Sequence, residues 1–502
     1  MNFLADRKAS QTMDRISSEN FLIPPLVLME KASESIRDEI LKLPAIRDVL
    51  VFAGCGNNGG DAVCCGRMLA DEGKNVRIVS VTGGHRESPA LKSQLETAKR
   101  LGLEIMDFNE FSGNLTDIPP FFKADLIIDG LFGTGLSRPM EGDFLRAVKI
   151  INSSAAVKIA VDIPSGISCD TGQVLGCAVR ADITVTFGLG KVGLKVYPGI
   201  DYAGRITTVK NVFPGKAIET AVRGMSPRIF TFTEDDIKNL FPERRGRKHK
   251  GSFGHALVIA GSSKYSGAAF LSASGAYRIG AGLVKVFTHE ANRELIADKL
   301  PEALLDTYVD KQSALSSLND NISWADAILI GPGLSQDETA KSLVKEVLKC
   351  TDKPVVIDAD ALNIIAEESL CSLLKANQIM TPHLMEYKRL SGHDMEIIRS
   401  HTLEEMMNYT MPPVLVLKDA VTLVRQDDNI YINTTGNSAL SKGGSGDVLA
   451  GMMLGLLSQG MENFPAASLA VYLHGACADK YVETRESYTM LASEIPEMLK
   501  SI

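Results

Sequence analysis

Short runs of valine, isoleucine and other β-formers recur along most of this chain, separated by longer helical patterns, and this alternation limits the fold more than any other feature. Continuous apolar runs of this kind form strands buried on both faces, as in a parallel sheet covered by helices. A first series lies at residues 48–53, 76–81, 126–128, 158–161, 183–187 and 205–209, and a second at 256–260, 283–287, 327–330, 355–357 and 414–417. Since no fixed-period repeat accompanies them, the fold class is α/β rather than a solenoid.

The length of the chain and a break between the two series predict two domains. The 502 residues exceed the ~250–300 that one hydrophobic core usually supports. Between the series lies a stretch without clear periodicity that contains Pro214-Gly215 and Gly224-Met225-Ser226-Pro227. We therefore expect one domain over residues 1–220, with one or two helices before its first strand, and a second over 225–502.

Charge and cysteine usage exclude several classes of protein. A net charge of −8 argues against a surface built for nucleic acid or anionic lipid, so the basic stretch at 244–250 is interpreted as a solvated connector or a local phosphate contact. Eight cysteines without a Cys-x-x-Cys pair or metal-ligand spacing indicate reduced thiols. The charged N-terminus does not suit a signal peptide, and no uncharged apolar run reaches the ~18 residues of a membrane helix. We expect a cytoplasmic protein without membrane or nucleic-acid partners.

A glycine-rich segment at residues 51–61 marks a first candidate site, because it lies where the first predicted strand gives way to a helix. Glycines there bring backbone N–H groups close to a phosphate, and the helix N-terminus adds partial positive charge. Three further segments follow later strands, at residues 129–136, 162–166 and 187–191. A glycine-rich turn alone is a weak signal, but the ends of parallel strands share one edge of a sheet, so these segments are expected to meet.

Two kinds of polar residue stand out in these segments. Asn58, Asp129 and Ser165 offer oxygen ligands from separate loops, which suits an alkali or similar cation. Asp162, beside a proline turn, is the best-placed general acid or base, although a turn carboxylate can instead cap the following helix.

Together and in this order, the four segments resemble the YjeF N-terminal family, the NAD(P)H-hydrate epimerases, over about residues 10–215; Met13-Asp14 and Leu28-Met29-Glu30 fit it too. The resemblance implies a Rossmann-like three-layer αβα domain in which Asp162 moves a proton. It also implies that Asn58, Asp129 and Ser165 hold potassium. The residues that it places against the dinucleotide are Asn57, Asn58, Gly59, Gly60, Asp61, Gly133, Thr134, Gly135, Leu136, Ser137, Arg138 and Asp162.

Ala62 departs from that family, which usually has glycine after Gly-Gly-Asp. A methyl group is costly where the backbone needs a positive φ or a very close approach. The departure motivates a second hypothesis, in which the N-terminal half is a non-catalytic binding module.

The strongest signal in the chain is the run from Gly436 to Gly451, whose consecutive glycines precede a helix that opens with Asp447. Successive N–H groups in such a turn converge on one anion, and a carboxylate beside them can deprotonate an alcohol that attacks a terminal phosphate. No Gly-x-x-x-x-Gly-Lys-Ser/Thr motif occurs. The run looks instead like the anion hole of the ribokinase-like superfamily.

Seven more segments occur in one order: 248–260, 261–269, 280–284, 331–334, 358–363, 381–386 and 418–422. With the glycine run they resemble the YjeF C-terminal family, the ADP/ATP-dependent NAD(P)H-hydrate dehydratases, over roughly residues 230–500. The resemblance implies that Ala268, Gly333, His383 and Asp447 contact the hydrated dinucleotide. The adenine nucleotide is assigned to Lys418, Asp419, Ala420, Val421 and Thr422, and to Asn437, Gly443, Gly444, Ser445 and Gly446.

Two of these residues have simpler interpretations. A lone His383 is often a satisfied histidine in a helix-start turn. Glu386 either helps to hold Mg²⁺ through water or supports the first turn of a helix.

The resemblance predicts a bifunctional repair enzyme that interconverts the R and S hydrates of NAD(P)H and dehydrates the S epimer. Phosphorylation by ADP, or by ATP, with Mg²⁺ turns the ring hydroxyl into a good leaving group, with Asp447 as base and Gly443 to Gly446 as anion hole. Bacterial members of the family favour ADP, and we expect a homo-oligomer. The alternative is a ribokinase-like kinase of a small alcohol with a non-catalytic N-terminal domain.

Overall fold

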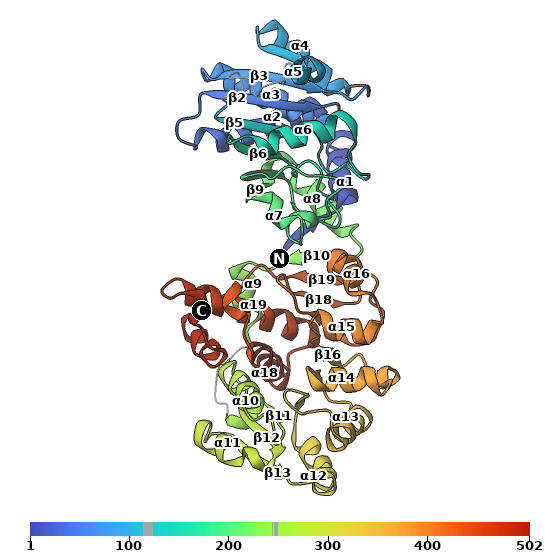
Figure 1. Ribbon diagram of the computed structural model, residues 1–502, viewed down its shortest axis with the longest axis vertical. Helices are drawn as coiled ribbons and strands as arrows, with labels where there is room; N and C mark the ends of the chain where they lie inside the picture. The colour runs from blue at the N-terminus through green and yellow to red at the C-terminus, as the bar shows by residue number, and fades with distance from the viewer. Residues whose placement is uncertain (114–123, 243, 245–248) are drawn as a thin grey trace. The chain divides into compact units, whose positions relative to one another are not determined.

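Two compact units make up the computed structural model, which describes residues 1–113, 124–242, 244 and 249–502 (Figure 1). One unit spans Asn2–Ile229, and the other spans Phe230–Ile502 together with Met1. The predicted domains differ from these units over residues 221–229. That stretch begins inside helix α8 (Gly215–Arg223), which packs on α1 (Arg7–Glu19) through Ala221, so the first unit extends past residue 220.

The first unit is built on a parallel sheet with the order β4-β3-β2-β5-β6-β7-β9. Its strands are β2 (Asp48–Gly54), β3 (Asn75–Val81), β4 (Glu104–Asp107), β5 (Leu126–Gly130), β6 (Val157–Val161), β7 (Ile183–Phe187) and β9 (Arg205–Val209). A short parallel pair, β1 (Asn2–Ala5) and β8 (Gly190–Lys191), is not part of this sheet. The order reverses direction between β2 and β5, and open α/β sheets bind ligands at such a point.

Helices cover both faces of this sheet, which confirms the three-layer αβα prediction. On one face, Val49 and Val51 pack under α2 (Pro25–Leu41), α3 (Asn57–Asp71) and α4 (Pro89–Arg100). On the other face, Leu50 and Phe52 pack under α5 (Phe108–Gly113) and α6 (Gly142–Ser153). The short α7 (Ile200–Ala203) precedes β9. Both faces of β2 are thus buried, as the uninterrupted apolar run requires.

The second unit repeats this arrangement with an antiparallel extension. Its sheet runs β13-β12-β11-β14-β15-β16-β17 in parallel, and β18 and β19 follow antiparallel. The strands are β11 (His255–Ile259), β12 (Leu283–His289), β13 (Leu304–Tyr308), β14 (Ala327–Ile330), β15 (Val355–Ile357), β16 (Gln378–Met380), β17 (Val414–Leu417), β18 (Leu423–Gln426) and β19 (Asn429–Ile432), and β10 (Arg228–Thr231) leads into the unit. The order again reverses direction, between β11 and β14.

The main helices of this unit are α10 (Gly267–Arg278), α12 (Lys311–Trp324), α13 (Glu338–Cys350), α14 (Asp360–Glu367), α15 (Leu384–Ser391), α18 (Ser445–Ser458) and α19 (Asn463–Val482). Shorter ones are α9 (Glu234–Leu240), α11 (Arg293–Lys299), α16 (Met395–Ser400), α17 (Thr402–Met407) and α20 (Ile495–Met498). Helix α18 packs against α10, α19 and the central strands and is buried along nearly its whole length. An apolar helix of this kind belongs in the core, and it carries Asp447 at its start.

The basic stretch at residues 244–250 is described only in part. Residues 245–248 of the basic stretch, and with them the start of the 248–260 segment, lie outside the described residues. Arg244 donates to the carbonyl of Gly280 and stacks its guanidinium over Phe253, with 4.2 Å to the ring centroid.

No helix among the described residues has both the length and the apolar character to span a bilayer.

Candidate functional site

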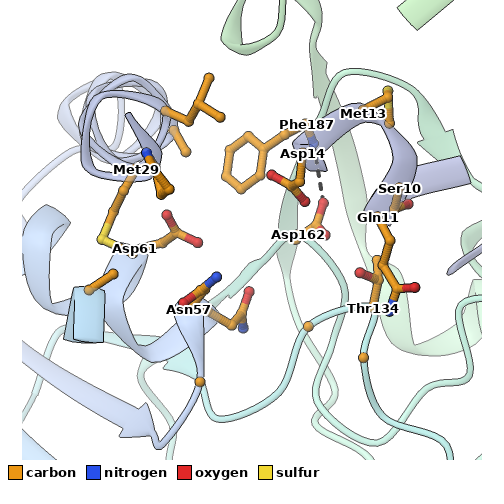
Figure 2. Close-up of a pocket in the computed structure, with 18 of the residues that line it drawn as sticks. Ser10, Gln11, Met13, Asp14, Met29, Asn57, Asp61, Thr134, Asp162 and Phe187 are labelled. Atoms are coloured by element: carbon orange, nitrogen blue, oxygen red, sulfur yellow. Dashed lines mark hydrogen bonds between the residues drawn. The ribbon is translucent and has the colours of Figure 1, made fainter. Parts of the chain in front are cut away.

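A pocket of about 590 Å³ opens at the carboxyl ends of the strands in the first unit, next to the reversal in strand order. Loops after β2, β5, β6 and β7 form part of its wall, and α1, α2 and the start of α3 supply most of the rest. Figure 2 shows Asp14 and Asp162 on one side and Asp61 with Met29 on the other. The loops predicted to meet at this edge of the sheet therefore do so.

Asp162, at the end of β6, is held in an unusual backbone conformation. Its φ of +67° is uncommon outside glycine, and its N–H donates to the carbonyl of Val185 at 2.8 Å. Its Oδ1 accepts hydrogen bonds from the hydroxyl of Thr186 at 2.9 Å and from the N–H of Phe187 at 3.3 Å. Lys191 Nζ lies 2.8 Å from the same oxygen, and Lys191 is 1% exposed. The strained backbone aims a charge-paired carboxylate into the pocket.

Two further carboxyl groups share the pocket. No hydrogen bond or ion pair within the described parts of the chain involves the side chain of Asp14 or of Asp61. Enclosure by the pocket walls, with repulsion from Asp162, raises the pKa of Asp14 to about 6. Enclosure, with repulsion from Asp162 and Asp14, raises the pKa of Asp61 well above its ordinary value. Enclosure in the pocket therefore favours the protonated form of both carboxyl groups.

Two of the predicted potassium ligands, Asp129 and Ser165, form a buried pair, while the third, Asn58, lines the pocket. Ser165 Oγ donates to Asp129 Oδ1 at 2.6 Å, and Ser165 N–H donates to Asp129 Oδ2 at 2.8 Å. Ser165 Oγ also accepts from the N–H of Phe132 at 2.8 Å. Burial raises the pKa of Asp129 to about 6, and none of the ion pairs among the residues described involves it. The Asn58 amide nitrogen is buried without a partner. A buried carboxylate without a cationic neighbour has the charge that a monovalent cation would balance.

The structure brings most, but not all, of the predicted epimerase residues to the pocket wall. Those that line it are Asn57, Asn58, Asp61, Gly133, Thr134, Gly135, Leu136 and Asp162. Gly59 and Gly60 are buried in the first turn of α3, and a Cβ on Gly59 would lie 2.0 Å from the carbonyl oxygen of Gly54. Ser137 and Arg138 are exposed and are not part of the wall. Glycine at 59 thus lets the helix start approach β2 closely.

Ala62 is accommodated without strain. It lies inside α3, is fully buried and has a negative φ. A Cβ on Gly130 would lie only 2.3 Å from the Ala62 Cβ, so the space for this methyl comes from the neighbouring strand. The steric concern raised by the sequence does not apply to this position.

In the second unit, a buried ion pair lies beside Asp447. Lys418 Nζ is 2.8 Å from Asp358 Oδ1, which also accepts the hydroxyl hydrogen of Thr381 at 2.7 Å. Burial lowers the pKa of Lys418, but Asp358, Glu386 and Asp447 outweigh it and raise that pKa. Burial, and then repulsion from Asp358, raises the pKa of Asp447 to about 7, although Lys418 opposes this. No hydrogen bond or ion pair of the described residues involves the Asp447 carboxyl, so it is free to act on a ligand.

The glycine turn before Asp447 has the geometry expected of an anion-binding loop. Gly444 caps α18 with a φ of +91°, a conformation that favours glycine. Gly446 lies near Lys418, because a Cβ there would be 3.4 Å from Lys418 Nζ. The carbonyl of Ser445 accepts a hydrogen bond from His474 Nε2 at 3.0 Å, and burial lowers the pKa of His474 to about 4. A neutral histidine therefore holds the turn in place.

His383 and Glu386 form the start of α15. His383 Nδ1 accepts from the N–H of Met385 at 3.1 Å and of Glu386 at 3.2 Å, while Glu386 Oε2 accepts from the N–H of His383 at 2.9 Å. This is a reciprocal capping box, so both side chains have a structural role. His383 is exposed and pairs its backbone with Lys418, and its Nε2 lies 3.5 Å from Glu386 Oε1. Burial raises the pKa of Glu386 to about 7.

The remaining predicted residues lie at three places on the same sheet edge. A Cβ on Gly333, after β14, would be 2.9 Å from the Ala268 Cβ, so these two are brought together. Lys418 to Thr422 form the turn between β17 and β18. Asn437 Nδ2 donates to Asp479 Oδ1 at 2.9 Å, which fixes the chain that leads into Gly443.

Sequence reasoning gave no role to Lys191, Asp358 or His474, although each supports a predicted site. Lys191 and Asp358 lie in segments that were singled out, at 187–191 and 358–363. His474 lies in the middle of α19, where a histidine carries no local signal. Only the distances show that these side chains contact the predicted ones.

Two protein families match the chain, one in each unit. Residues 25–193 match the family described as YjeF-related protein N-terminus. Residues 256–501 match the family described as NAD(P)H-hydrate dehydratase. The first match contains Asp162, and the second contains Asp447.

Named relatives align with nearly the whole chain. A protein of Moorella thermoacetica, named bifunctional NAD(P)H-hydrate repair enzyme Nnr, is 34% identical over 504 residues, which cover 97% of this chain and 94% of the relative. The protein of the same name from Escherichia coli K12 is 31% identical and covers 91% and 85%. Among solved structures, a ribokinase-like superfamily protein from Enterococcus faecalis V583 has a TM-score of 0.50 and 28% identity, over 54% of this chain and 94% of that one. The ribokinase-like prediction for the second unit is thereby confirmed.

Proposed function

Because this chain belongs to the family of bifunctional NAD(P)H-hydrate repair enzymes, we propose that its two sites divide the family's two reactions between them. The enzyme is an NAD(P)H-hydrate epimerase and dehydratase. Asp162 is the proton-transfer group of the epimerase, and Asp447 is the base of the dehydratase. The observation that carries this assignment is that Asp447 has no side-chain partner among the described residues, has a pKa raised to about 7 and directly follows a glycine turn.

In the epimerase reaction, the pocket of the first unit holds the hydrated dinucleotide. The hydrated ring carbon bears a hydroxyl and is bonded to the ring nitrogen, so removal of the hydroxyl proton opens the ring. Asp162 is placed for this because Lys191, Thr186 and Phe187 all contact one of its oxygens and orient the other toward the pocket. Polar side chains at Asn57 and Thr134, with the N–H groups at the start of α3, bind the phosphates.

Asn58, Asp129 and Ser165 fit a potassium ion in charge and chemistry. Potassium would balance the buried Asp129 carboxylate and add positive charge near the dinucleotide phosphates. Without it, Asp129 and Ser165 still hold the loop after β5 against the loop after β6. We propose these three residues as its ligands.

In the dehydratase reaction, Asp447 takes the proton of the ring hydroxyl as that oxygen attacks the terminal phosphorus of the adenine nucleotide. The N–H groups of Gly443 to Gly446, with Lys418 nearby, bind the transferred phosphoryl group. Phosphate then leaves as the electron pair of the ring nitrogen forms an iminium ion, and loss of a proton from the adjacent ring carbon to the departing phosphate restores the dihydropyridine. Ala268, Gly333 and His383 contact the hydrated ring, and the turn from Lys418 to Thr422 with Asn437 contacts the nucleotide.

The donor is ADP or ATP, and we propose ADP on the resemblance to bacterial dehydratases. Mg²⁺ would neutralise the nucleotide phosphates when bound. Glu386 suits the supporting role better than a direct metal contact, because one of its oxygens already caps α15. The S epimer is the one dehydrated. Cytoplasmic location and homo-oligomeric assembly stay predictions from the sequence.

The small-alcohol kinase is the weaker alternative, because it does not account for the first unit. The relatives named as repair enzymes align with both units, and the steric objection to a functional first unit, at Ala62, is absent.

The recovery of reduced-nicotinamide absorbance from a mixture of both NADH hydrate epimers tests the proposal. With Mg²⁺, potassium and ADP or ATP, we expect full recovery that depends on the nucleotide. Recovery that stops at the fraction of the S epimer would leave the first unit without an epimerase function. No recovery would favour the small-alcohol kinase.

A further inference from the structure

The pocket of the first unit contains more carboxyl groups than its one buried cation can balance. Asp14, Asp61 and Asp162 all line it. Lys191 is committed to Asp162, with 2.8 Å between Nζ and Oδ1. The other cation on the wall, Arg15, pairs instead with Glu19 at the exposed surface, at 3.3 Å. Among the residues described, Asp14 and Asp61 therefore have no direct cationic partner in this pocket.

Asp14 lies where a second proton-transfer group is needed. It projects from α1 toward the pocket, and Figure 2 shows it on the same side as Asp162, close enough for their charges to repel. Its carboxyl has no hydrogen-bond or ion-pair partner among the side chains described, so it can contact a ligand. Enclosure, then repulsion from Asp162, raises its pKa to about 6, while Lys191 opposes this shift. A group of this pKa exchanges its proton readily near neutral pH.

We propose that Asp14 is a catalytic residue of the epimerase, the general acid that works with the Asp162 base. This inference rests on the proposed function of the pocket. Opening the ring at the hydrated carbon breaks a carbon–nitrogen bond, and the nitrogen that leaves needs a proton. A base alone does not supply it.

The two carboxyl groups balance the reaction in both directions. Asp162 takes the hydroxyl proton, the carbon–oxygen bond becomes a double bond, and the carbon–nitrogen bond breaks with its electron pair on nitrogen. Asp14 gives its proton to that nitrogen, which leaves an open-chain aldehyde. After rotation about the adjacent carbon–carbon bond, the nitrogen attacks the other face of the carbonyl. Asp14 then takes back its proton, and Asp162 returns the other proton to the oxygen.

Asp61 fits a different role. Enclosure, with repulsion from Asp162 and Asp14, raises its pKa well above the ordinary value, which favours its protonated form. It lies across the pocket from Asp14 and Asp162 (Figure 2). A carboxyl that stays protonated can donate a hydrogen bond to the substrate, but it does not cycle between its two forms as the reaction requires.

The test compares Asp14→Asn, Asp14→Glu and Asp162→Asn in the full-length enzyme, with Glu19→Gln as the matched control. Glu19 is an exposed carboxylate on the same helix that does not line the pocket. The readout is the formation of reduced nicotinamide from the purified R epimer, after subtraction of the rate without enzyme. The same preparation assayed with the S epimer reports the dehydratase, and amide hydrogen exchange in α1 reports the fold of the first unit.

We expect Asp14→Asn to lower the rate on the R epimer by about 10²–10⁴-fold, the usual contribution of general acid catalysis. The rate on the S epimer should not change, and Asp14→Glu should recover part of the loss. In the wild type, kcat/KM for the R epimer should fall as pH rises through the pKa of Asp14, because the acid loses its proton. Asp14→Asn should abolish this alkaline limb.

Three results would overturn either the inference about Asp14 or the proposed function on which it rests, and each result shows which of the two is wrong. A wild-type rate for Asp14→Asn, with Asp162→Asn inactive, would reject the catalytic role of Asp14 and leave the proposed function of the pocket intact. A slow Asp14→Asn enzyme that keeps the alkaline limb would show that Asp14 only positions other groups. A full rate for Asp162→Asn, or a wild-type enzyme without R-epimer activity, would reject the proposed function itself.

Discussion

The two sites use the same components but connect them differently. Each has an aspartate near the carboxyl edge of a parallel sheet and a buried lysine close by. In the first unit, Lys191 contacts Asp162, with 2.8 Å between Nζ and Oδ1. In the second unit, Lys418 contacts Asp358 at the same distance, and Asp447 has no direct cationic partner in the part of the chain that the structure describes. In each unit, the position of the lysine therefore decides which carboxylate it pairs with; in the second unit this leaves Asp447 with a raised pKa.

The backbone differs in a parallel way. In the first unit the strained residue is Asp162 itself, with a φ of +67°. In the second unit it is Ala359, with a φ of +51°, between Asp358 and Asp360. Strain of this kind persists only where the surrounding structure holds it. In both units, therefore, the fold holds a strained backbone conformation that positions a carboxylate.

Removal of the uncompensated carboxylate should have the largest effect. We expect Asp447→Asn to lower dehydratase kcat/KM by about 10³-fold or more, because the amide cannot accept the hydroxyl proton. Epimerase activity in the same chain, followed by the loss of the R epimer, should be unchanged. Asp235→Asn, at an exposed carboxylate, is the control. A dehydratase that survives Asp447→Asn would mean that another group is the base.

Removal of Lys191 tests the difference between the two sites, because it leaves the Asp162 carboxylate without a contacting cation, as is Asp447 among the described residues of the second unit. Lys191→Met leaves Asp162 uncompensated, so we expect a loss of ~3–5 kcal/mol in the free energy of unfolding of the first unit, together with slower epimerisation. Denaturant unfolding and R-epimer kinetics are the measurements. The double variant Lys191→Met/Asp162→Asn should regain stability but not activity.

Exposed Lys216→Met serves as the control for the loss of a lysine charge. If the double variant is no more stable than Lys191→Met, the two residues are not energetically coupled, and the 2.8 Å contact is without consequence.

Removal of Lys418 should act mainly on the pH dependence of the dehydratase. Lys418 opposes the rise in the pKa of Asp447, which lies at about 7. Lys418→Met should raise that pKa further, so the base is ionised only at higher pH. The acidic limb of kcat/KM should move upward by about one unit, a tenfold loss of rate below it. Lys418→Arg keeps the charge and should keep the limb in place; a limb that stays in place in both variants would exclude this coupling.

Ala62→Gly should give the smallest change. Glycine in the interior of α3 is expected to cost about 0.5–1 kcal/mol in stability, since the backbone loses more entropy on folding. Epimerase activity should be close to that of the wild type, because the Ala62 methyl fits against Gly130 without strain. Thermal unfolding and R-epimer kinetics test this. A marked gain in activity on this substitution would restore the idea that alanine impairs the site.

Most strands that the sequence indicated have continuous apolar runs and are central in their sheets, such as β2, β5, β6, β11 and β14; β9, an edge strand, was indicated as well. Those it missed among the described residues are β1, β4, β8, β10, β13, β16, β18 and β19. Strands β4 and β13 are edge strands with mixed burial, so only one face selects apolar residues. Strand β16 is three residues long, too short for a periodic pattern. The hairpin of β18 and β19 is partly polar because one end is exposed.

The sequence by itself determined the α/β class, the two-unit organisation and the segments that carry Asp162 and Asp447. These depend on local features, namely apolar runs, glycine turns and the residues that follow strand ends. Only the tertiary structure decided which charges face one another: Lys191 with Asp162, Lys418 with Asp358, and Asp14 beside Asp162. These partners are far apart in sequence or lie on helices, and burial, which sets their protonation, arises only when the whole unit packs.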